Sequence, residues 1–338
     1  MNSSVLEILR ARAAKGSTPP HVDGASVALC IEGGAMRGVV SAGMVLALEQ
    51  LGMLECFDAV YGSSAGAMNG AYFLAGQAAF GTTIYYEDIN NALFIDFTRP
   101  LRGRPVVDLD YVVGDVMVRR KPLDTTRVLA SPIPLTAVAT DARTAARHVF
   151  RDFQDARQLL SALRAGSTMP IIAGPPYARG NGEYFDALLT EPVPVPIAES
   201  DGHTHLLALL TRPASPADRQ MSYLERVLIA PRLNRISPAL GKLYVERTAV
   251  YTALLKQIAA GRGPGGRAIV LGVHPAGPLV SKLERRRARL VAGATRGAEA
   301  IFSLMTGRAF RCVETLTGFD DSSHRVTPDG PLSRRSRP

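Results

Sequence analysis

Two glycine-rich segments near the start of the chain carry residue types suited to acyl transfer. Each follows a short apolar run that predicts a buried strand and precedes a run that predicts a helix. The first, residues 32–38, would present backbone N–H groups at a helix start, where the helix dipole favours negative charge. The second, residues 62–66, has the Gly-x-Ser-x-Gly spacing of a nucleophile elbow, which places Ser64 on a strained, exposed turn. An anion-binding turn and an exposed serine on neighbouring strands are the two halves of an acyl-transfer site.

Nucleotide binding is the alternative for a glycine-rich turn before a helix. The Gly-x-Gly-x-x-Gly spacing of dinucleotide-binding folds is absent, and no acid ends a second strand about 20 residues further on. The P-loop pattern Gly-x-x-x-x-Gly-Lys-Ser/Thr is absent too. The two motifs together therefore favour a serine hydrolase.

At these residues the sequence resembles the patatin-like phospholipase family. The family's motif Gly-Gly-Gly-x-Arg/Lys-Gly is matched at residues 33–38, with Ala35 in place of the third glycine, and its elbow serine falls on Ser64. The resemblance to a bacterial branch continues through residues 108–111, 121–124, 273–275 and 283–285, so it spans roughly residues 26–305. It implies a Ser–Asp dyad whose acid lies in a Tyr-x-Asp-Gly-Gly/Ala segment, which here falls on Asp186. Ala187 and Leu188 depart from the small residues of that segment, which leaves open whether they narrow the acyl site or displace the carboxylate.

The resemblance implies a lipid acyl hydrolase of the phospholipase or lysophospholipase type, working through an acyl-serine intermediate without a cofactor or metal. Asp186 is expected to accept the proton of Ser64, and Arg37 either orders the glycine loop or meets a lipid phosphate. The alternative is a catalytically degenerate relative that binds lipid or protein, with Ala187 and Leu188 as its support. The residues expected at the oxyanion site are Gly33, Gly34, Ala35, Arg37, Gly38 and Ala65.

A Ser-His-Asp triad on an α/β-hydrolase fold is the other architecture open to Ser64. It needs serine, acid and histidine in that chain order, and the histidines after the elbow are His148, His203, His205, His274 and His324. His203 and His205 flank a strand start and are the best placed of these. The elbow, however, comes before most of the strands that such a fold places upstream, so the dyad is favoured.

The elements that must position these residues alternate along the chain between apolar strands and helices. Strands buried on both faces of a mostly parallel sheet are predicted at Val27–Ile31, Phe57–Tyr61, Leu135–Thr140, Leu206–Thr211 and Ala268–Val273. Helices are predicted at Val40–Leu51, Ala65–Leu74, Leu159–Ala165 and Tyr244–Ile258. This alternation predicts an α/β fold, a three-layer α/β/α sandwich with helical insertions. We expect one catalytic domain over residues 25–310, a flexible segment over 1–24 with a frayed helix, and a largely disordered tail over 311–338.

Composition narrows the remaining choices. The 338 residues are 46% hydrophobic and 20% charged, which is ordinary for a globular protein. No apolar run approaches the ~18 residues of a membrane span, the first residues lack the pattern of a signal peptide, and the three cysteines suggest core thiols of a cytoplasmic protein. The net charge of +9 is compatible with peripheral contact with an anionic membrane surface, or with a solvated surface. Nucleic acid is not expected, because no recognition motif and no tryptophan are present. The segments Ala79–Phe97 and Val227–Leu255 are candidates for the wall of an acyl channel, and the sequence does not indicate an oligomeric state.

Overall fold

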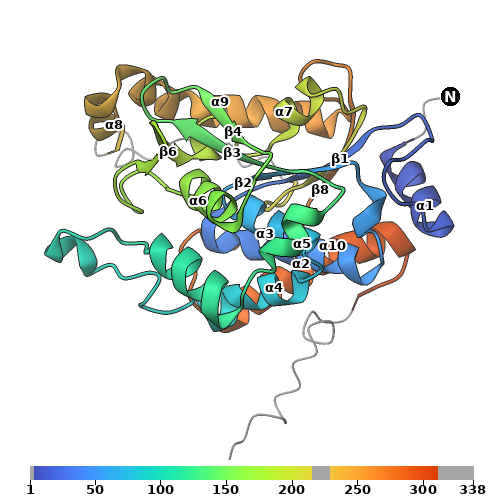
Figure 1. The fold of residues 1–338 in the computed structure, drawn as a ribbon, viewed down its shortest axis with the longest axis horizontal. Helices are drawn as coiled ribbons and strands as arrows, with labels where there is room; N and C mark the ends of the chain where they lie inside the picture. The colour runs from blue at the N-terminus through green and yellow to red at the C-terminus, as the bar shows by residue number, and fades with distance from the viewer. Residues whose placement is uncertain (1–3, 215–228, 311–338) are drawn as a thin grey trace, which may run out of the picture.

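The computed structural model describes residues 4–214 and 229–310, which fold around one mixed sheet (Figure 1). The strand order is β5-β6-β3-β2-β1-β7-β8, with β4 paired to β3 outside this path. Strands β3, β2, β1, β7 and β8 are parallel to one another, whereas β4 and β6 each pair antiparallel with β3 and β5 pairs antiparallel with β6. The strands are β1 Val27–Ile31, β2 Ala59–Ser63, β3 Leu135–Asp141, β4 Arg147–Phe150, β5 Tyr177–Arg179, β6 Gly182–Asp186, β7 His205–Leu209 and β8 Ile269–Val273.

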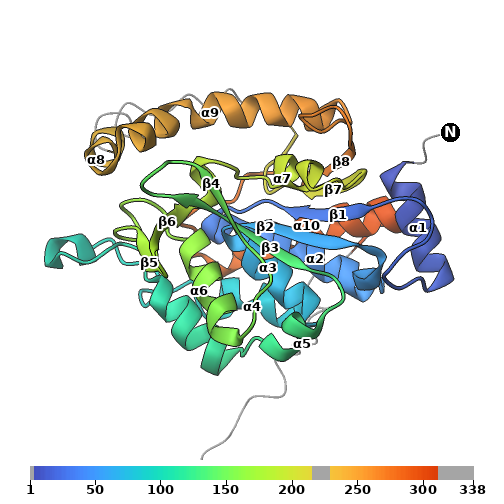
Figure 2. The same ribbon diagram turned by 45° about the horizontal axis from the view of Figure 1, so that its top comes forward.

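Helices cover both faces of this sheet, as Figures 1 and 2 show. The face that is lower in Figure 1 carries α2 Val39–Gln50, α3 Ala65–Leu74, α4 Ala78–Glu87, α5 Thr125–Ala130, α6 Ala156–Gly166 and α10 Arg287–Thr306. The opposite face carries α7 Val195–Ser200, α8 Ala230–Ile236 and α9 Pro238–Ala259. Single turns and irregular helices complete the chain: η1 Ala35–Gly38, η2 Leu54–Cys56, η3 Arg99–Arg102, η4 Tyr111–Arg120 and η5 Ala187–Leu189.

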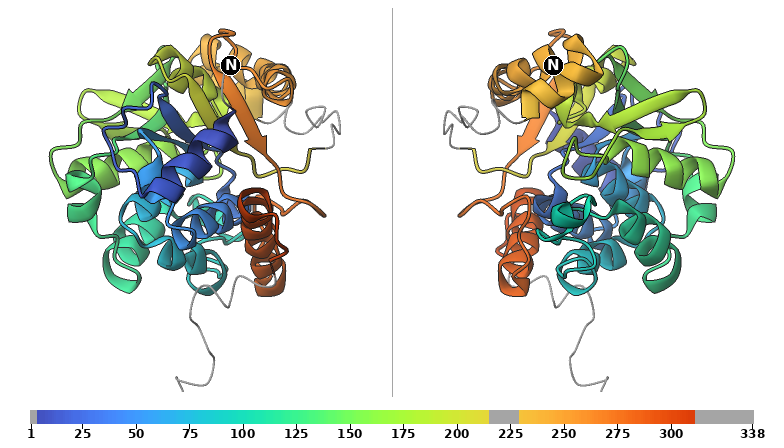
Figure 3. Two further views of the ribbon diagram at one scale, coloured as in Figure 1. Left: turned by 90° about the vertical axis from the view of Figure 1, so that its right-hand side faces the viewer. Right: turned by 90° about the vertical axis from the view of Figure 1, so that its left-hand side faces the viewer.

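The strand β1 shows why the sequence requires two helical layers. Its side chains alternate between the two faces of the sheet, as in any strand. Leu29 and Ile31 belong to the core beneath the sheet, while Ala28 and Cys30 belong to the core shared with α7 and α9. All five residues of the strand are buried. The predicted three-layer α/β/α sandwich with a mostly parallel central sheet is therefore confirmed, and Figure 3 shows the sheet between α9 and α10.

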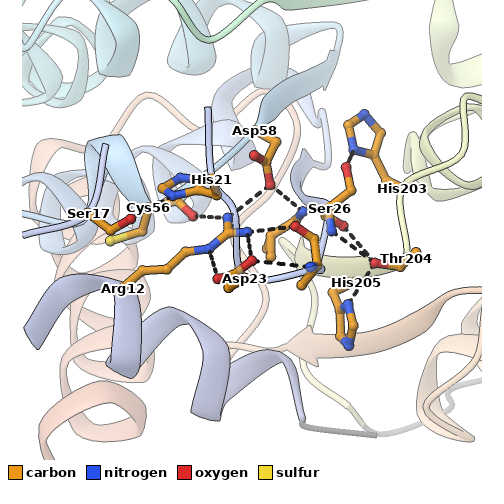
Figure 4. Close-up of polar contacts among 12 residues, drawn as sticks. Arg12, Ser17, His21, Asp23, Ser26, Cys56, Asp58, His203, Thr204 and His205 are labelled. Atoms are coloured by element: carbon orange, nitrogen blue, oxygen red, sulfur yellow. Dashed lines mark hydrogen bonds and ion pairs between the residues drawn. The ribbon is translucent and has the colours of Figure 1, made fainter. Parts of the chain in front are cut away.

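The N-terminal segment differs from the flexible stretch expected over residues 1–24. Helix α1 Val5–Lys15 begins with a capping box between Ser4 and Glu7 and packs on the body of the protein. Its Arg12 is only 2% exposed and donates hydrogen bonds to the carboxylates of Asp23 and Asp58 and to two backbone carbonyls (Figure 4). The Arg12 guanidinium holds the pKa of Asp23 well below its usual range. This ion-pair cluster fixes the helix, and sequence periodicity carries no sign of it. The tail expected over residues 311–338 lies outside the described residues.

None of the helices within residues 4–214 and 229–310 combines the length and the apolar composition needed to cross a membrane.

Candidate active site

The turn from β2 into α3 holds Ser64 in a strained conformation. Its backbone angles are φ 55° and ψ −129°, a region that residues other than glycine rarely occupy. The flanking glycines are required by close contacts, because a Cβ at Gly62 would lie 2.3 Å from Ala67 Cα and one at Gly66 would lie 2.3 Å from the Ile31 oxygen. Ser64 is 6% exposed and faces a cavity, so the turn is buried rather than exposed as its motif suggested.

Strand register brings Asp186 to this serine. Ser63 at the end of β2 pairs with Val138 of β3, and Asp186 at the end of β6 pairs with the next β3 residue, Ala139. Ser64 Oγ consequently donates a 2.6 Å hydrogen bond to Asp186 Oδ2. The second carboxylate oxygen, Oδ1, accepts a 2.7 Å hydrogen bond from the Leu188 backbone N–H. The two residues that the resemblance singled out are thus in direct contact.

Burial changes the pKa of the Asp186 carboxyl group, because this residue is only 1% exposed. Loss of water raises the pKa of Asp186 to about 6, while the hydrogen bonds from Ser64 and Leu188 and the charge of Lys282 pull it down. A carboxyl group with a pKa near neutrality can hold a proton taken from a hydroxyl group, which an ordinary aspartate does poorly.

The glycine-rich loop before η1 lies directly against the elbow. A Cβ at Gly33 would lie 2.4 Å from the Ser63 oxygen and 2.7 Å from Ser64 Cβ, so only glycine fits there. Ala35, which replaces the third glycine of the motif, adopts a left-handed φ of 52°. An alanine at such a position costs about 1–2 kcal/mol.

The six residues expected at the oxyanion site fall into two sets: those whose backbone N–H has no hydrogen-bond acceptor in the described part of the chain and those with a structural role. No described residue accepts a hydrogen bond from the N–H groups of Gly34, Ala35 or Ala65. By contrast, the Gly33 N–H donates to the Pro192 oxygen at 3.4 Å, and the Arg37 N–H donates to the Gly34 oxygen at 3.1 Å. Gly38 has a packing role, because a Cβ there would lie 2.7 Å from Ala65 Cβ and 2.8 Å from Tyr85 Oη. Three of the six therefore keep a backbone N–H group without a partner among the described residues, and Gly33, Arg37 and Gly38 shape the loop.

Buried charges brace this loop. The Arg37 side chain is 3% exposed and donates from Nε to Thr211 Oγ1 at 3.0 Å. Glu32, 1% exposed, accepts hydrogen bonds from the Thr211 backbone N–H at 2.5 Å and from the Tyr251 hydroxyl at 2.7 Å. These contacts agree with the loop-ordering interpretation of Arg37. Sequence reasoning assigned no role to Glu32, and no local signal links it to Tyr251, which lies on α9.

His203 and His205, the histidines that the sequence placed best for a triad, lie away from this site. His205 begins β7 and pairs with Val27 at the start of β1, whereas Ser64 follows the end of β2. Because these strands are parallel and five residues long, their amino ends and their carboxyl ends are about 16 Å apart. His203 hydrogen-bonds to Ser26 at the amino ends of the strands, far from Ser64 (Figure 4). Among the described residues no histidine hydrogen-bonds to Ser64 or Asp186. His324 lies outside the described residues.

A largely apolar cavity opens beside Ser64. The segment Ala79–Phe97 contributes to its wall, as the sequence suggested, whereas Val227–Leu255, part of which is not described, does not. Ser167, which the sequence did not single out as a site residue, lines it with a buried hydroxyl that has no partner among the described residues. The lining residues are Ala35, Ser64, Ala65, Met68, Asn69, Tyr72, Gly81, Ile84, Tyr85, Ile89, Phe94, Leu109, Val112, Met117, Ser167 and Met169. Within the described part of the chain, no group of three or more His, Cys, Asp or Glu side chains is arranged to hold a metal ion.

Comparison with known families assigns the chain to a family. A family model described as patatin-like phospholipase matches residues 29–199, just over half of the chain. The chain belongs to the patatin-like phospholipase family. The matched residues include both turns and Asp186, and the family is one of lipid acyl hydrolases.

Two individual proteins are similar to this patatin-like chain. One is the uncharacterized protein YjjU of Escherichia coli (strain K12), 28% identical over 191 residues, which are 56% of this chain and 52% of YjjU. The chain therefore spans about half the length of this curated relative. The other is VipD from Legionella pneumophila, with a TM-score of 0.34 and 11% identity over 84% of this chain and 67% of VipD. A likeness at that score is too weak to support any argument about this chain.

Proposed function

We propose that this protein is a serine hydrolase of lipid acyl esters, with Ser64 as nucleophile and Asp186 as its base. The observation that carries the proposal is the 2.6 Å hydrogen bond to the buried Asp186 carboxylate from Oγ of Ser64, a residue that lines an apolar cavity. Family membership supports the reaction class. The pKa of Asp186, raised to about 6, supports its role as proton acceptor.

Acylation begins with the transfer of the Ser64 proton to Asp186. The Oγ atom attacks the ester carbonyl carbon, and the carbonyl oxygen becomes a tetrahedral oxyanion. The N–H groups of Gly34, Ala35 and Ala65 stabilise this charge, and each such donor is typically worth about 3–4 kcal/mol. Ala65 also begins helix α3, whose dipole favours negative charge at this end.

The same groups complete acylation and then carry out deacylation. The oxyanion collapses, the bond to the alcohol breaks, and Asp186 returns the proton to the leaving alkoxide. Water then attacks the acyl-serine while Asp186 accepts its proton, and a second collapse releases the fatty acid and restores Ser64.

The cavity supports an apolar acyl chain as the group that is transferred. Its wall is made of methionine, isoleucine, leucine, valine and aromatic side chains, with Asn69 and Ser167 as its polar members besides Ser64. Asn69 already binds Tyr85 and the Gly38 oxygen, so it is not free to bind a polar headgroup. Phospholipids, lysophospholipids and neutral glycerides all carry a suitable acyl chain.

The degenerate alternative loses its main support at Leu188. The backbone N–H of Leu188 donates to Asp186, and its side chain packs against apolar clusters instead of lining the cavity. We therefore expect Leu188→Gly to leave ester turnover similar. Wild type inactive on every ester tried, with turnover restored by Leu188→Gly, would favour the degenerate relative.

A fluorophosphonate probe and a p-nitrophenyl ester series test the proposal. We expect the probe to label wild type and not Ser64→Ala, and Asp186→Asn to lower ester turnover by orders of magnitude. Ser63→Ala is the matched control, because the Ser63 hydroxyl binds the Glu191 oxygen and not the dyad. Full labelling of Ser64→Ala, or a loss of activity in His203→Ala comparable with that of Asp186→Asn, would refute the assignment.

A further inference from the structure

A protrusion formed by residues 93–104 exposes large apolar side chains at its tip. It includes η3 and stands away from the body of the protein at the left of Figures 1 and 2. Leu101 is 88% exposed, Phe97 is 61% exposed and Leu93 is 53% exposed. Single exposed apolar residues are common, but three on one projecting segment form the kind of patch that marks an interaction surface.

The protrusion is held in shape by a buried arginine. Arg99 is 8% exposed, and its guanidinium donates hydrogen bonds to the backbone oxygens of Ala92, Leu93, Phe94 and Val106 at 2.6–3.4 Å. The Asp96 N–H also donates to the Val106 oxygen, and Ile95 bridges to Val107. The apolar tip is therefore held outward by an internal scaffold and does not fold back to bury itself.

The tip is basic as well as apolar. Residues 93–104 contain three arginines and one acidic residue, Asp96; Arg102 and Arg104 are exposed, whereas Arg99 is buried. Arg102 is exposed and has no ion-pair partner among the described residues, while the exposed Arg104 lies 3.7 Å from Asp108. The carboxylate of Asp96 accepts hydrogen bonds from the backbone N–H and the hydroxyl of Thr98. Apolar side chains beside arginines match the two layers of an anionic membrane surface, which offers acyl chains below phosphate groups.

The base of the same segment forms part of the wall of the cavity beside Ser64. Ile89 and Phe94 precede the protrusion or belong to its base, Leu109 and Val112 follow it, and all four line the cavity. A lipid surface in contact with the tip would therefore lie next to the wall of the candidate acyl site.

We propose that residues 93–104 insert into an anionic lipid surface and hold the cavity against it. Phe97 and Leu101 enter the acyl layer, while Arg102 and Arg104 meet the phosphate groups. The purpose of this contact rests on the proposed hydrolase function, but the contact itself does not, so binding is tested without turnover.

Binding is measured by flotation of the full chain carrying Ser64→Ala with vesicles. One set is phosphatidylcholine alone, and in the other set part of it is replaced by phosphatidylglycerol. Phe97→Ser/Leu101→Ser should weaken the partition coefficient at least about tenfold, because binding scales with buried apolar area. Val245→Ser/Val250→Ser, which replaces two exposed apolar side chains on α9, is the control and should bind like its parent.

The charge contribution is tested in the same assay. Arg102→Gln/Arg104→Gln should weaken binding to the anionic vesicles by about fivefold for each arginine, and the loss should shrink as salt is added. Lys242→Gln, on α9, is its control. Melting curves of all variants should match the parent, because the substituted side chains are exposed.

Three results would overturn the proposal. The first is a parent protein that does not float with either vesicle set, and the second is a Phe97→Ser/Leu101→Ser variant that binds as well as its parent. The third is a variant whose oligomeric state changes in sedimentation while vesicle binding does not, which would assign the tip to a second copy of the chain. In the wild-type background, Phe97→Ser/Leu101→Ser should keep turnover of a water-soluble ester and lose turnover of vesicle lipid. Absence of all turnover would refute the hydrolase function and leave the binding result intact.

Discussion

The raised pKa of Asp186 predicts how ester turnover depends on pH. In the proposed mechanism Asp186 is the base and must be ionised before it can accept the Ser64 proton, so kcat/KM should rise with pH in proportion to the ionised fraction. Burial raises the pKa of this group from 3.8 to about 6, and its hydrogen bonds only partly offset that rise. The activity should therefore be half-maximal near pH 6 and reach a plateau above it.

The magnitude of the effect separates the buried carboxyl group from an ordinary one. With a pKa of about 6, about 9% of Asp186 is ionised at pH 5, whereas an unperturbed aspartate would be about 94% ionised there. Turnover at pH 5 should thus be roughly a tenth of the plateau value. Initial rates with a water-soluble p-nitrophenyl ester, below KM and in buffers of constant ionic strength, measure this directly.

A histidine base would give a similar profile, so two controls are needed. The ionisation of a carboxyl group has little enthalpy, whereas that of an imidazolium is strongly endothermic, so the midpoint should hardly move with temperature. His203→Ala should leave the midpoint unchanged, because His203 lies at the amino ends of the strands, whereas Ser64 lies at their carboxyl ends. A rate independent of pH between 4 and 7, or a midpoint that falls steeply on heating, would refute Asp186 as the base.

Three further substitutions have outcomes set by the geometry. Folding raises the pKa of Asp186, so the stability that its protonated form contributes is fully present below pH 3.8 and is lost as pH rises through about 6. In urea unfolding, Asp186→Asn should therefore gain up to about 3 kcal/mol of unfolding free energy over wild type between pH 4 and 7. A difference that does not change with pH would contradict this. Gly33→Ala should lower ester turnover at least about a hundredfold, because its Cβ would collide with the elbow. The control Gly114→Ala, whose Cβ meets nothing within 4 Å, should keep full turnover, and equal rates for the two variants would show that the loop can shift. Ala35→Gly should raise the free energy of unfolding by up to about 1 kcal/mol and keep activity, since glycine accepts the φ of 52° without strain, and a loss of stability would mean that the methyl group contributes packing.

Much of the fold could be predicted because its signals are local. Strand β1 is apolar at every position, and an unbroken apolar run of that length predicts burial on both faces. The elbow is equally local, because the spacing of Gly62, Ser64 and Gly66 follows from the contacts of a single turn. The antiparallel strands β4 to β6 were not predicted, since they are short and only partly buried and carry a weak apolar pattern.

The sequence by itself determined which residues are suited to the chemistry, and the tertiary structure decided which of them meet. Ser64 and Asp186 are 122 residues apart, and their contact depends on β2 and β6 both ending beside β3. The same holds for Glu32 and Tyr251, 219 residues apart, and for the ion pairs that fix α1 through Arg12. A pattern in sequence reports the neighbours a residue has along its own strand or helix. The pKa of a carboxyl group, the N–H groups left without a backbone partner and the wall of a cavity depend on neighbours brought together from distant segments, and only the packed structure supplies these.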